Sequence, residues 1–214
     1  QTESDCEIII HLYSKLPVET FIKELDGVFS FIIYDKNKSA FYIGHDPLGV
    51  RPLYWYTNDD NSEIGVSSEM KSLHGLSDNI QFYPPGTYSY YYMKTKKLHT
   101  YSYYKFNYPL IKDNDEGNIV KIIKDKLEKA VKKRLITDRP FGCLLSGGLD
   151  SSIVVSIISK FIDPEFIQTF AIGLEGSPDL AAAQKVADYI GTNHTNVVVS
   201  EADMLKAIDS TIYQ

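Results

Sequence analysis

The sequence predicts two successive fold classes, an antiparallel α+β region followed by the beginning of an α/β region. The first half is rich in short strand-like segments separated by tight polar turns, and strands joined so closely pair antiparallel. The second half alternates helical and strand-like segments, which is typical of βαβ units and a parallel sheet. A polar stretch between the two patterns is predicted to be a linker.

Three hairpins are predicted in the first half, after two short helices near residues 4–15 and 18–25. Each consists of two runs rich in aromatic and β-branched residues around a polar turn. The paired runs are Gly27–Asp35 with Ala40–Asp46, Leu53–Thr57 with Glu63–Ser68, and Thr87–Thr95 with Lys97–Phe106. The third pair carries many tyrosines without interleaved basic residues, so we interpret them as sheet packing and not as a stacking surface for nucleic acid.

The second half begins with apolar residues at helical spacing between Ile119 and Leu135. The segments that follow are an apolar strand at Phe141–Ser146, a helix at Ser151–Phe161, a strand at Gln168–Gly173, a helix at Leu180–Gly191, a strand at Thr195–Ser200 and a helix at Glu201–Tyr213. We therefore place the first domain at residues 1–108, the linker at 109–118 and the second domain at 119–214.

Composition excludes several classes of protein. The 214 residues carry a formal net charge of −6, which argues against a nucleic-acid binder because such proteins present a basic face. The two cysteines, Cys6 and Cys143, lie in unlike contexts, so we expect no disulfide and a reduced, cytoplasmic setting. No run approaches about 18 apolar residues, so no membrane span is expected.

Because Gln1 opens the chain and Gln214 directly follows a helical run, we expect a piece of a longer protein.

The segment Ser146–Ser152 has the composition of a phosphate-binding loop. An apolar strand ends at Ser146, Gly147 and Gly148 follow, and a helix is predicted to start near Ser151. Glycines let backbone N–H groups approach a ligand, and a helix N-terminus attracts anions. The serine hydroxyls add further donors. Two glycines between a strand and a helix can also be a simple tight turn, but the full order of strand, glycines, hydroxyls and helix favours phosphate binding.

The loop lacks the lysine of a Walker loop. No lysine lies between Phe141 and Ser159, and Asp150 stands in the loop instead. A carboxylate beside phosphates requires a divalent cation, and Mg²⁺ commonly bridges one carboxylate and phosphate oxygens. This composition favours a site that grips pyrophosphate during attack on the α-phosphate of ATP, which is AMP transfer and not transfer of the γ-phosphate.

With these motifs in place, the chain resembles the glutamine-hydrolysing asparagine synthetase family over nearly its whole length. LLSGGLDSS (Leu144–Ser152) is similar to the family's pyrophosphate loop, and FAIGLEGSPDLAAAQKVADYIGTNH (Phe170–His194) to the segment that follows it. The first half resembles the family's amidotransferase domain in the segments SDCEII (Ser4–Ile9), LDGVFSFIIYD (Leu25–Asp35), GHDPLGVRPLYW (Gly44–Trp55), SSEMKSL (Ser67–Leu73) and PPGTY (Pro84–Tyr88). Because several independent motifs occur in the family's order, the match is specific.

The resemblance implies both a fold and a reaction. The fold is the C-terminal part of a class II glutamine amidotransferase domain, which is Ntn-hydrolase-like, followed by the N-terminal part of a PP-loop ATP pyrophosphatase-like synthetase domain. The reaction is the ATP-dependent amidation of aspartate through β-aspartyl-AMP with ammonia from glutamine, so the protein is a carbon–nitrogen ligase. Its cofactors are ATP and Mg²⁺, and its partners are small molecules, with no nucleic acid and no membrane. A homodimer is compatible with this assignment, and the isolated chain is expected to be inactive.

The resemblance assigns site residues by position. Asp5 matches a glutamine-binding aspartate, although an acid there also suits the first turn of a helix. The ATP-binding residues are Leu145, Ser146, Gly147, Gly148, Asp150, Ser151 and Ile172, with Asp150 also holding the metal. Ile172 is equally compatible with a plain buried strand residue. The family's glutaminase nucleophile is an N-terminal cysteine, and since position 1 is Gln and Cys6 is no replacement, no catalytic residue is assigned within the chain.

Two other functions remain open at this point. One is a related adenylating ligase, similar to β-lactam synthetase, that uses the same loop on another carboxylate. The SDCE motif around Asp5 favours the asparagine synthetase reading, because relatives without glutaminase activity do not need a glutamine-binding aspartate. The other is a non-catalytic fragment that binds nucleotide or partners only.

Overall fold

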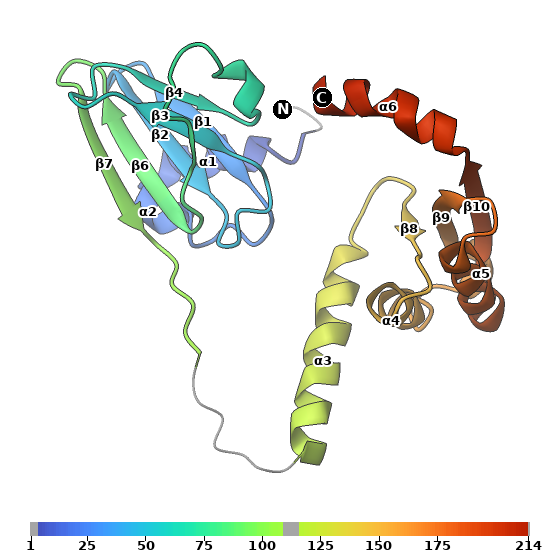
Figure 1. Ribbon diagram of the computed structural model, residues 1–214. Helices are drawn as coiled ribbons and strands as arrows, with labels where there is room; N and C mark the ends of the chain where they lie inside the picture. The colour runs from blue at the N-terminus through green and yellow to red at the C-terminus, as the bar shows by residue number, and fades with distance from the viewer. Residues whose placement is uncertain (1–3, 109–115, 214) are drawn as a thin grey trace. The chain divides into compact units, whose positions relative to one another are not determined.

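The computed structural model describes residues 4–108 and 116–213, and the chain divides into two compact units, 1–110 and 111–214 (Figure 1). The predicted domain limits stay predictions, because residues 109–115 of the predicted linker lie outside the described residues.

The first unit consists of two short helices followed by short antiparallel strands. Its elements are α1 (Glu7–Lys15), α2 (Val18–Phe21), β1 (Ser30–Asp35), β2 (Ala40–His45), β3 (Tyr54–Thr57), β4 (Ile64–Ser67), the 3₁₀ turn η1 (Met70–Ser72), β5 (Gln81–Phe82), β6 (Thr87–Tyr92) and β7 (Lys97–Ser102). The three predicted hairpins are confirmed by the antiparallel pairs β1–β2, β3–β4 and β6–β7. The two-residue strand β5, which pairs with β3, was not predicted because it is too short to show a period.

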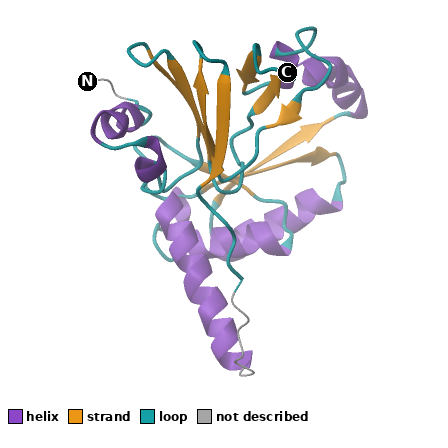
Figure 2. Cartoon of the chain, turned by 90° about the vertical axis from the view of Figure 1, so that its left-hand side faces the viewer, coloured by secondary structure: helices purple, strands orange, loops and turns teal. Residues whose placement is uncertain are grey.

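Two sheets and a helix pair form the layers of this unit (Figure 2). One sheet has the order β1-β2-β6-β7 and the other β4-β3-β5. Neighbouring residues of β2 point to opposite faces of the first sheet. Tyr42 packs in a cluster with Phe21 of α2, whereas Ile43 packs in a cluster with Leu53 and Tyr83 beside the second sheet. The strand β2 is therefore buried on both faces, between the helices and the second sheet.

Tyrosines fill much of the sheet formed by β6 and β7. Tyr88 and Tyr91 are buried. The ring of Tyr88 stacks on that of Tyr101 with 5.4 Å between centroids and meets Tyr90 edge-on, also at 5.4 Å. Such ring pairs add to the stability of neighbouring strands. The packing interpretation is thereby confirmed for Tyr88 and Tyr91, whereas Tyr92, Tyr101 and Tyr104 are exposed.

A buried aspartate, Asp46, organises the turn that follows β2. Its side chain is 1% exposed, and its carboxylate accepts hydrogen bonds from the backbone N–H groups of Phe29, Leu48, Val50 and Arg51 at 2.9–3.3 Å. Its backbone carbonyl accepts from Gly86 at 2.9 Å. Burial opposes ionisation, but the four backbone hydrogen bonds outweigh it and hold the pKa of Asp46 below its usual value. Through its carboxylate and its backbone carbonyl, Asp46 thus ties three loops of the first unit together.

The second unit alternates helices and parallel strands, as predicted. Its elements are α3 (Glu116–Arg134), β8 (Gly142–Leu144), α4 (Leu149–Ile158), the 3₁₀ turn η2 (Pro164–Phe166), β9 (Gln168–Leu174), α5 (Pro178–Ile190), β10 (Asn193–Val199) and α6 (Glu201–Tyr213). The sheet order is β10-β9-β8, with both pairs parallel. The start of α4 lies at Leu149, two residues before the predicted start at Ser151, so Asp150 belongs to the first turn of this helix.

The core of the second unit lies on one face of its sheet. Leu145, Val155, Ala171, Leu180, Ala183 and Ala187 form one buried cluster between the sheet and the helices α4 and α5. On the opposite face, Leu144 and Ile172 are 82% and 67% exposed. The helix α3 packs on α4 through Val131 in a second cluster. Across residues 4–108 and 116–213, none of the helices has the length and apolarity that crossing a membrane requires.

Candidate phosphate-binding site

The candidate site begins where β8 ends and α4 has not yet started. Leu145, the first residue after β8, is 1% exposed, and its N–H donates to the carbonyl of Phe170 in β9 at 2.8 Å. Its side chain belongs to the core cluster. Any contact of Leu145 with a nucleotide would therefore be made by its backbone, while its side chain anchors the loop.

Serine hydroxyls hold the loop in shape. The hydroxyl groups of Ser146 and Ser151 lie 3.0 Å apart, and Ser146 N–H donates to Ser151 Oγ at 3.2 Å. Gly148 N–H donates to Ser146 Oγ at 3.3 Å, and Ser152 Oγ donates to the Gly148 carbonyl at 2.7 Å. The hydroxyls of Ser146 and Ser151 thus hydrogen-bond inside the loop, and Ser146 remains exposed to an incoming ligand.

The two glycines of the loop have different roles. Gly147 has φ +75°, and a Cβ there would stand 2.5 Å from the carbonyl carbon of Ala182 in α5. Gly148 has φ −72° and ψ 164°, which any residue adopts, and a Cβ there would meet only Ser146 Oγ, at 3.3 Å. Gly147 is therefore required by the fold, whereas Gly148 leaves open space in front of the loop.

The first turn of α4 supplies the electrostatics of the site. Gly148 is its N-cap and no side chain caps the helix, so the first N–H groups are left for an anion. Asp150 is exposed in that turn. Within the described residues no group of three or more His, Cys, Asp or Glu side chains could hold a metal ion. A cation at Asp150 would take most of its ligands from phosphate and water, which fits Mg²⁺.

A pocket of about 300 Å³ opens at the carboxyl ends of β8 and β9. It is lined by Leu144, Leu145, Ser146, Ser151, Phe170, Ala171, Ile172, Asp179 and Leu180. Four predicted ATP-binding residues, Leu145, Ser146, Ser151 and Ile172, are therefore brought together, whereas Gly147, Gly148 and Asp150 do not line it. The reading of Ile172 as a buried strand residue is wrong, because its side chain is 67% exposed.

The other lining residues were not predicted as site residues: Leu144, Phe170, Ala171, Asp179 and Leu180. A signal for Asp179 was present in the sequence: it stands in the first turn of the helix after β9, and ligands bind beyond the carboxyl ends of parallel strands. The N–H of Asp179 donates to the hydroxyl of Ser177, the N-cap of α5, at 3.3 Å. The pocket thus lies between the beginnings of two helices.

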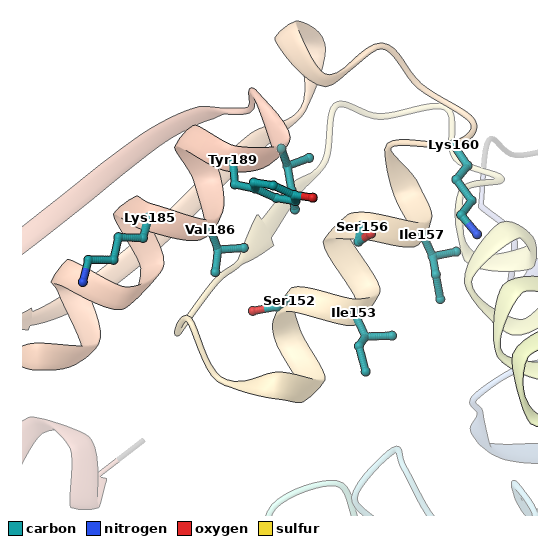
Figure 3. A pocket seen from close by; sticks show the side chains of 9 residues that line it. Ser152, Ile153, Ser156, Ile157, Lys160, Lys185, Val186 and Tyr189 are labelled. Atoms are coloured by element: carbon teal, nitrogen blue, oxygen red, sulfur yellow. The ribbon is translucent and has the colours of Figure 1, made fainter. Parts of the chain in front are cut away.

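A second, apolar groove of about 410 Å³ runs between α4 and α5 (Figure 3). Ile153 and Ile157 line it from α4, and Val186, Tyr189 and Ile190 from α5. Tyr189 is 92% exposed, and its ring extends from α5 over the groove. Apart from Ser152, this groove contains none of the predicted site residues and lacks Asp150. It is therefore distinct from the pocket at the strand ends.

Asp5, the predicted glutamine-binding residue, belongs to the first unit. It is exposed in the turn before α1, and its carbonyl accepts a hydrogen bond from Ile8 N–H at 3.4 Å. Because α1 begins at Glu7, Asp5 lies just outside the helix and not in its first turn. The alternative reading of Asp5 as a first-turn acid is therefore wrong in position, and its role in glutamine binding stays a prediction.

We expect the two glycines of the loop to respond differently to alanine. Gly147→Ala should lower the free energy of unfolding of the second unit by about 1–3 kcal/mol, because alanine resists this backbone conformation and its methyl group overlaps the backbone of α5. Gly148→Ala should change it by less than about 1 kcal/mol, since its backbone suits alanine. Denaturant unfolding of both variants checks this difference, and equal losses would contradict the separate roles.

Each half of the chain matches a known protein family. Residues 1–75 match the family model described as a glutamine amidotransferase domain, and residues 122–214 match the model described as asparagine synthase.

Glutamine-hydrolysing asparagine synthetases are similar to the chain over its whole length. Asparagine synthetase B of Escherichia coli K12 is 40% identical, and the enzymes of Sandersonia aurantiaca and Rattus norvegicus are 38% and 39% identical. The matched region makes up 40%, 41% and 42% of these three proteins, so the chain spans about two fifths of the length of the relatives it matches.

Proposed function

Because the chain belongs to the asparagine synthetase family, we propose that it supplies the ATP-gripping part of a glutamine-hydrolysing asparagine synthetase. The observation that carries this proposal is the loop between β8 and α4, where serine hydroxyls, an uncapped helix N-terminus and Asp150 occur together without a lysine. In fold terms we propose a PP-loop ATP pyrophosphatase-like arrangement for the second unit and an Ntn-hydrolase-like one for the first.

In the proposed reaction the loop holds the β- and γ-phosphates of ATP. The N–H groups at the start of α4 and the hydroxyls of Ser146 and Ser151 donate to phosphate oxygens, which stabilises the negative charge that builds up on the leaving pyrophosphate. Asp150 would hold Mg²⁺, which neutralises charge on the phosphates. The exposed side chain of Ile172 provides an apolar surface for the adenine.

The acceptor in this proposal is the side-chain carboxylate of aspartate. Its oxygen attacks the α-phosphorus, pyrophosphate leaves, and β-aspartyl-AMP forms. Ammonia then attacks the activated carbonyl carbon and AMP leaves, giving asparagine. Activation is needed because a free carboxylate has no good leaving group. The contribution of the loop is to fix the nucleotide so that the α-phosphorus faces the acceptor.

The first unit would serve the glutamine side of the reaction. We propose that the Asp5 carboxylate pairs with the α-amino group of glutamine, from which ammonia is released for the second unit. Both cysteines, Cys6 and Cys143, are free thiols, which suits a reducing compartment such as the cytoplasm. Burial raises the pKa of the Cys143 thiol, so this residue is a weak nucleophile and is not proposed as a catalyst.

The products of ATP consumption test the proposal. A protein of the length of these relatives that contains this chain, called the family-length protein below, should convert aspartate, ATP and glutamine into asparagine, AMP and pyrophosphate in equal amounts. Phosphorus NMR and amino-acid analysis measure these products. ADP and phosphate instead of AMP and pyrophosphate would contradict AMP transfer.

The same assay separates the two alternative functions. A ligase similar to β-lactam synthetase would release AMP and pyrophosphate with another carboxylic acid and not with aspartate. A non-catalytic nucleotide-binding protein would consume no ATP. The names of the relatives, all glutamine-hydrolysing asparagine synthetases, favour aspartate as the acceptor.

A further inference from the structure

The backbone of the phosphate loop rests directly on the helix α5. A Cβ at Gly147 would lie 2.6 Å from the Cβ of Ala182 and 2.6 Å from the backbone nitrogen of Ala183. The part of α5 nearest to the loop therefore consists of the backbone of Ala182 and Ala183 and the methyl group of Ala182. Since the nearest atoms are backbone and a methyl group, and not the end of a flexible side chain, neither side can give way without moving a whole element.

The helix α5 is itself fixed in the core. Ala183 and Ala187 are fully buried, and Leu180 is 8% exposed, in the cluster that also contains Leu145. Leu145 directly precedes the loop. The loop is thus held from two directions, by the buried side chain of Leu145 and by the contact of Gly147 with Ala182. Ala182 itself is half-buried, at the surface that faces the loop.

We propose that Ala182 is a positioning residue for phosphate binding: its methyl group sets the distance between the loop and α5 and so fixes where the loop N–H groups point. This inference rests on the proposed function of the loop as a pyrophosphate grip. Ala182 touches no substrate in this account and acts only through Gly147.

The size of residue 182 is the critical property. A leucine there must push either the loop or α5 away, and α5 is anchored by buried residues, so the loop moves. Displacing bound groups by about 1 Å can lower the rate of an enzyme reaction by on the order of 100-fold. A serine at the same position adds only one oxygen atom and can be accommodated by a small rotation.

The test compares Ala182→Leu with Ala181→Leu in the family-length protein. Ala181 is the preceding residue of α5 and is exposed, so it carries the same change on another face of the helix. We expect Ala182→Leu to raise the KM for ATP or lower kcat for asparagine synthesis, with kcat/KM for ATP falling at least about tenfold. Glutamine hydrolysis should stay close to wild type, the Tm should fall no further than in Gly147→Ala, and all properties of Ala181→Leu should stay close to wild type. Ala182→Ser should recover most of the activity.

Two outcomes would overturn the proposal. One is equal kinetics for the two leucine variants. The other is a parallel loss of synthesis, glutamine hydrolysis and Tm in Ala182→Leu that Ala182→Ser shares, because that pattern means a purely structural role.

Binding of inorganic pyrophosphate, measured by calorimetry, separates this inference from the proposed function. If the wild type binds pyrophosphate and Ala182→Leu binds it at least about tenfold more weakly, the positioning role holds even where no asparagine is made. If the wild type makes asparagine and both proteins bind pyrophosphate equally, the positioning role fails and the proposed function stands. If the wild type binds no pyrophosphate, the positioning role fails, and the reaction products alone decide the proposed function.

Discussion

Asp150→Asn is expected to abolish asparagine synthesis by the family-length protein while leaving glutamine hydrolysis largely intact. Asparagine keeps the shape of the side chain but removes its charge, so the site can no longer hold a divalent cation against the phosphates. Loss of one group that stabilises charge in a transition state typically lowers kcat by on the order of 100-fold or more. Steady-state rates of AMP formation and of glutamate formation, measured on the same preparation, check the two activities separately.

An exposed aspartate elsewhere in the second unit provides the control. Asp209 lies in α6 and is exposed, so Asp209→Asn makes the same change of charge away from the loop and should leave both activities unchanged. Equal loss of synthesis and hydrolysis in Asp150→Asn would contradict the assignment of the two reactions to separate sites. Unchanged synthesis would remove Asp150 from the nucleotide site.

Asp46→Asn is expected to destabilise the first unit by about 3–5 kcal/mol, which is the range for removing one partner from a buried charged network. The amide has one acceptor oxygen, and its NH₂ group would face backbone N–H donors that now bond to the carboxylate. At least one buried N–H group would lose its partner. Urea unfolding followed by tyrosine fluorescence or circular dichroism gives the change in the free energy of unfolding.

The lowered pKa of Asp46 predicts how the stability of the first unit depends on pH. The pKa of Asp46 is lower in the folded than in the unfolded chain, so its ionised form stabilises the fold. This contribution is fully present above the unfolded pKa of about 3.9 and is lost as the pH falls through the lower folded value. Wild type should therefore lose stability below about pH 4, and Asp46→Asn should show a shallower loss over the same range.

Two other polar side chains lie close to Asp46. His45 is buried with its ring nitrogens 3.0 and 2.7 Å from the carbonyl oxygens of Tyr83 and Arg51. Burial and the charge of Asp46 raise the pKa of Tyr103, whose hydroxyl donates to the His45 carbonyl at 2.8 Å. Asp59→Asn, at an exposed position of the same unit, controls for net charge and should unfold as wild type does. A loss of under about 1 kcal/mol in Asp46→Asn would show that the loops hold without the carboxylate.

Local patterns were sufficient to predict most of the fold. Hairpins such as Ser30–Asp35 with Ala40–His45 were predictable because both strands and the turn between them carry their own composition. The pairing of β5 with β3 was not, since two residues show no alternation. The start of α4 was placed two residues late. Leu149 and Asp150 resemble loop residues in the sequence, because the sequence alone does not show which side of the helix is exposed.

The candidate site could be proposed from its residue types, but its three-dimensional contacts could not be predicted. The glycines, serines and Asp150 were identified from their order in the loop. The separate roles of Gly147 and Gly148 depend on which of them faces α5, and α5 lies more than thirty residues later in the sequence. Asp46 was missed for the same reason, because its four donors come from two different loops.

The pocket at the strand ends has one more property, which concerns how the protein is made. All its lining residues fall between Leu144 and Leu180. The last two of them already belong to α5, the helix that supports the loop. Contacts between residues close in sequence form quickly, and a chain leaving the ribosome folds from its N-terminal side. The proposed nucleotide site can therefore assemble during translation as soon as α5 has emerged from the exit tunnel, before the residues after it are available.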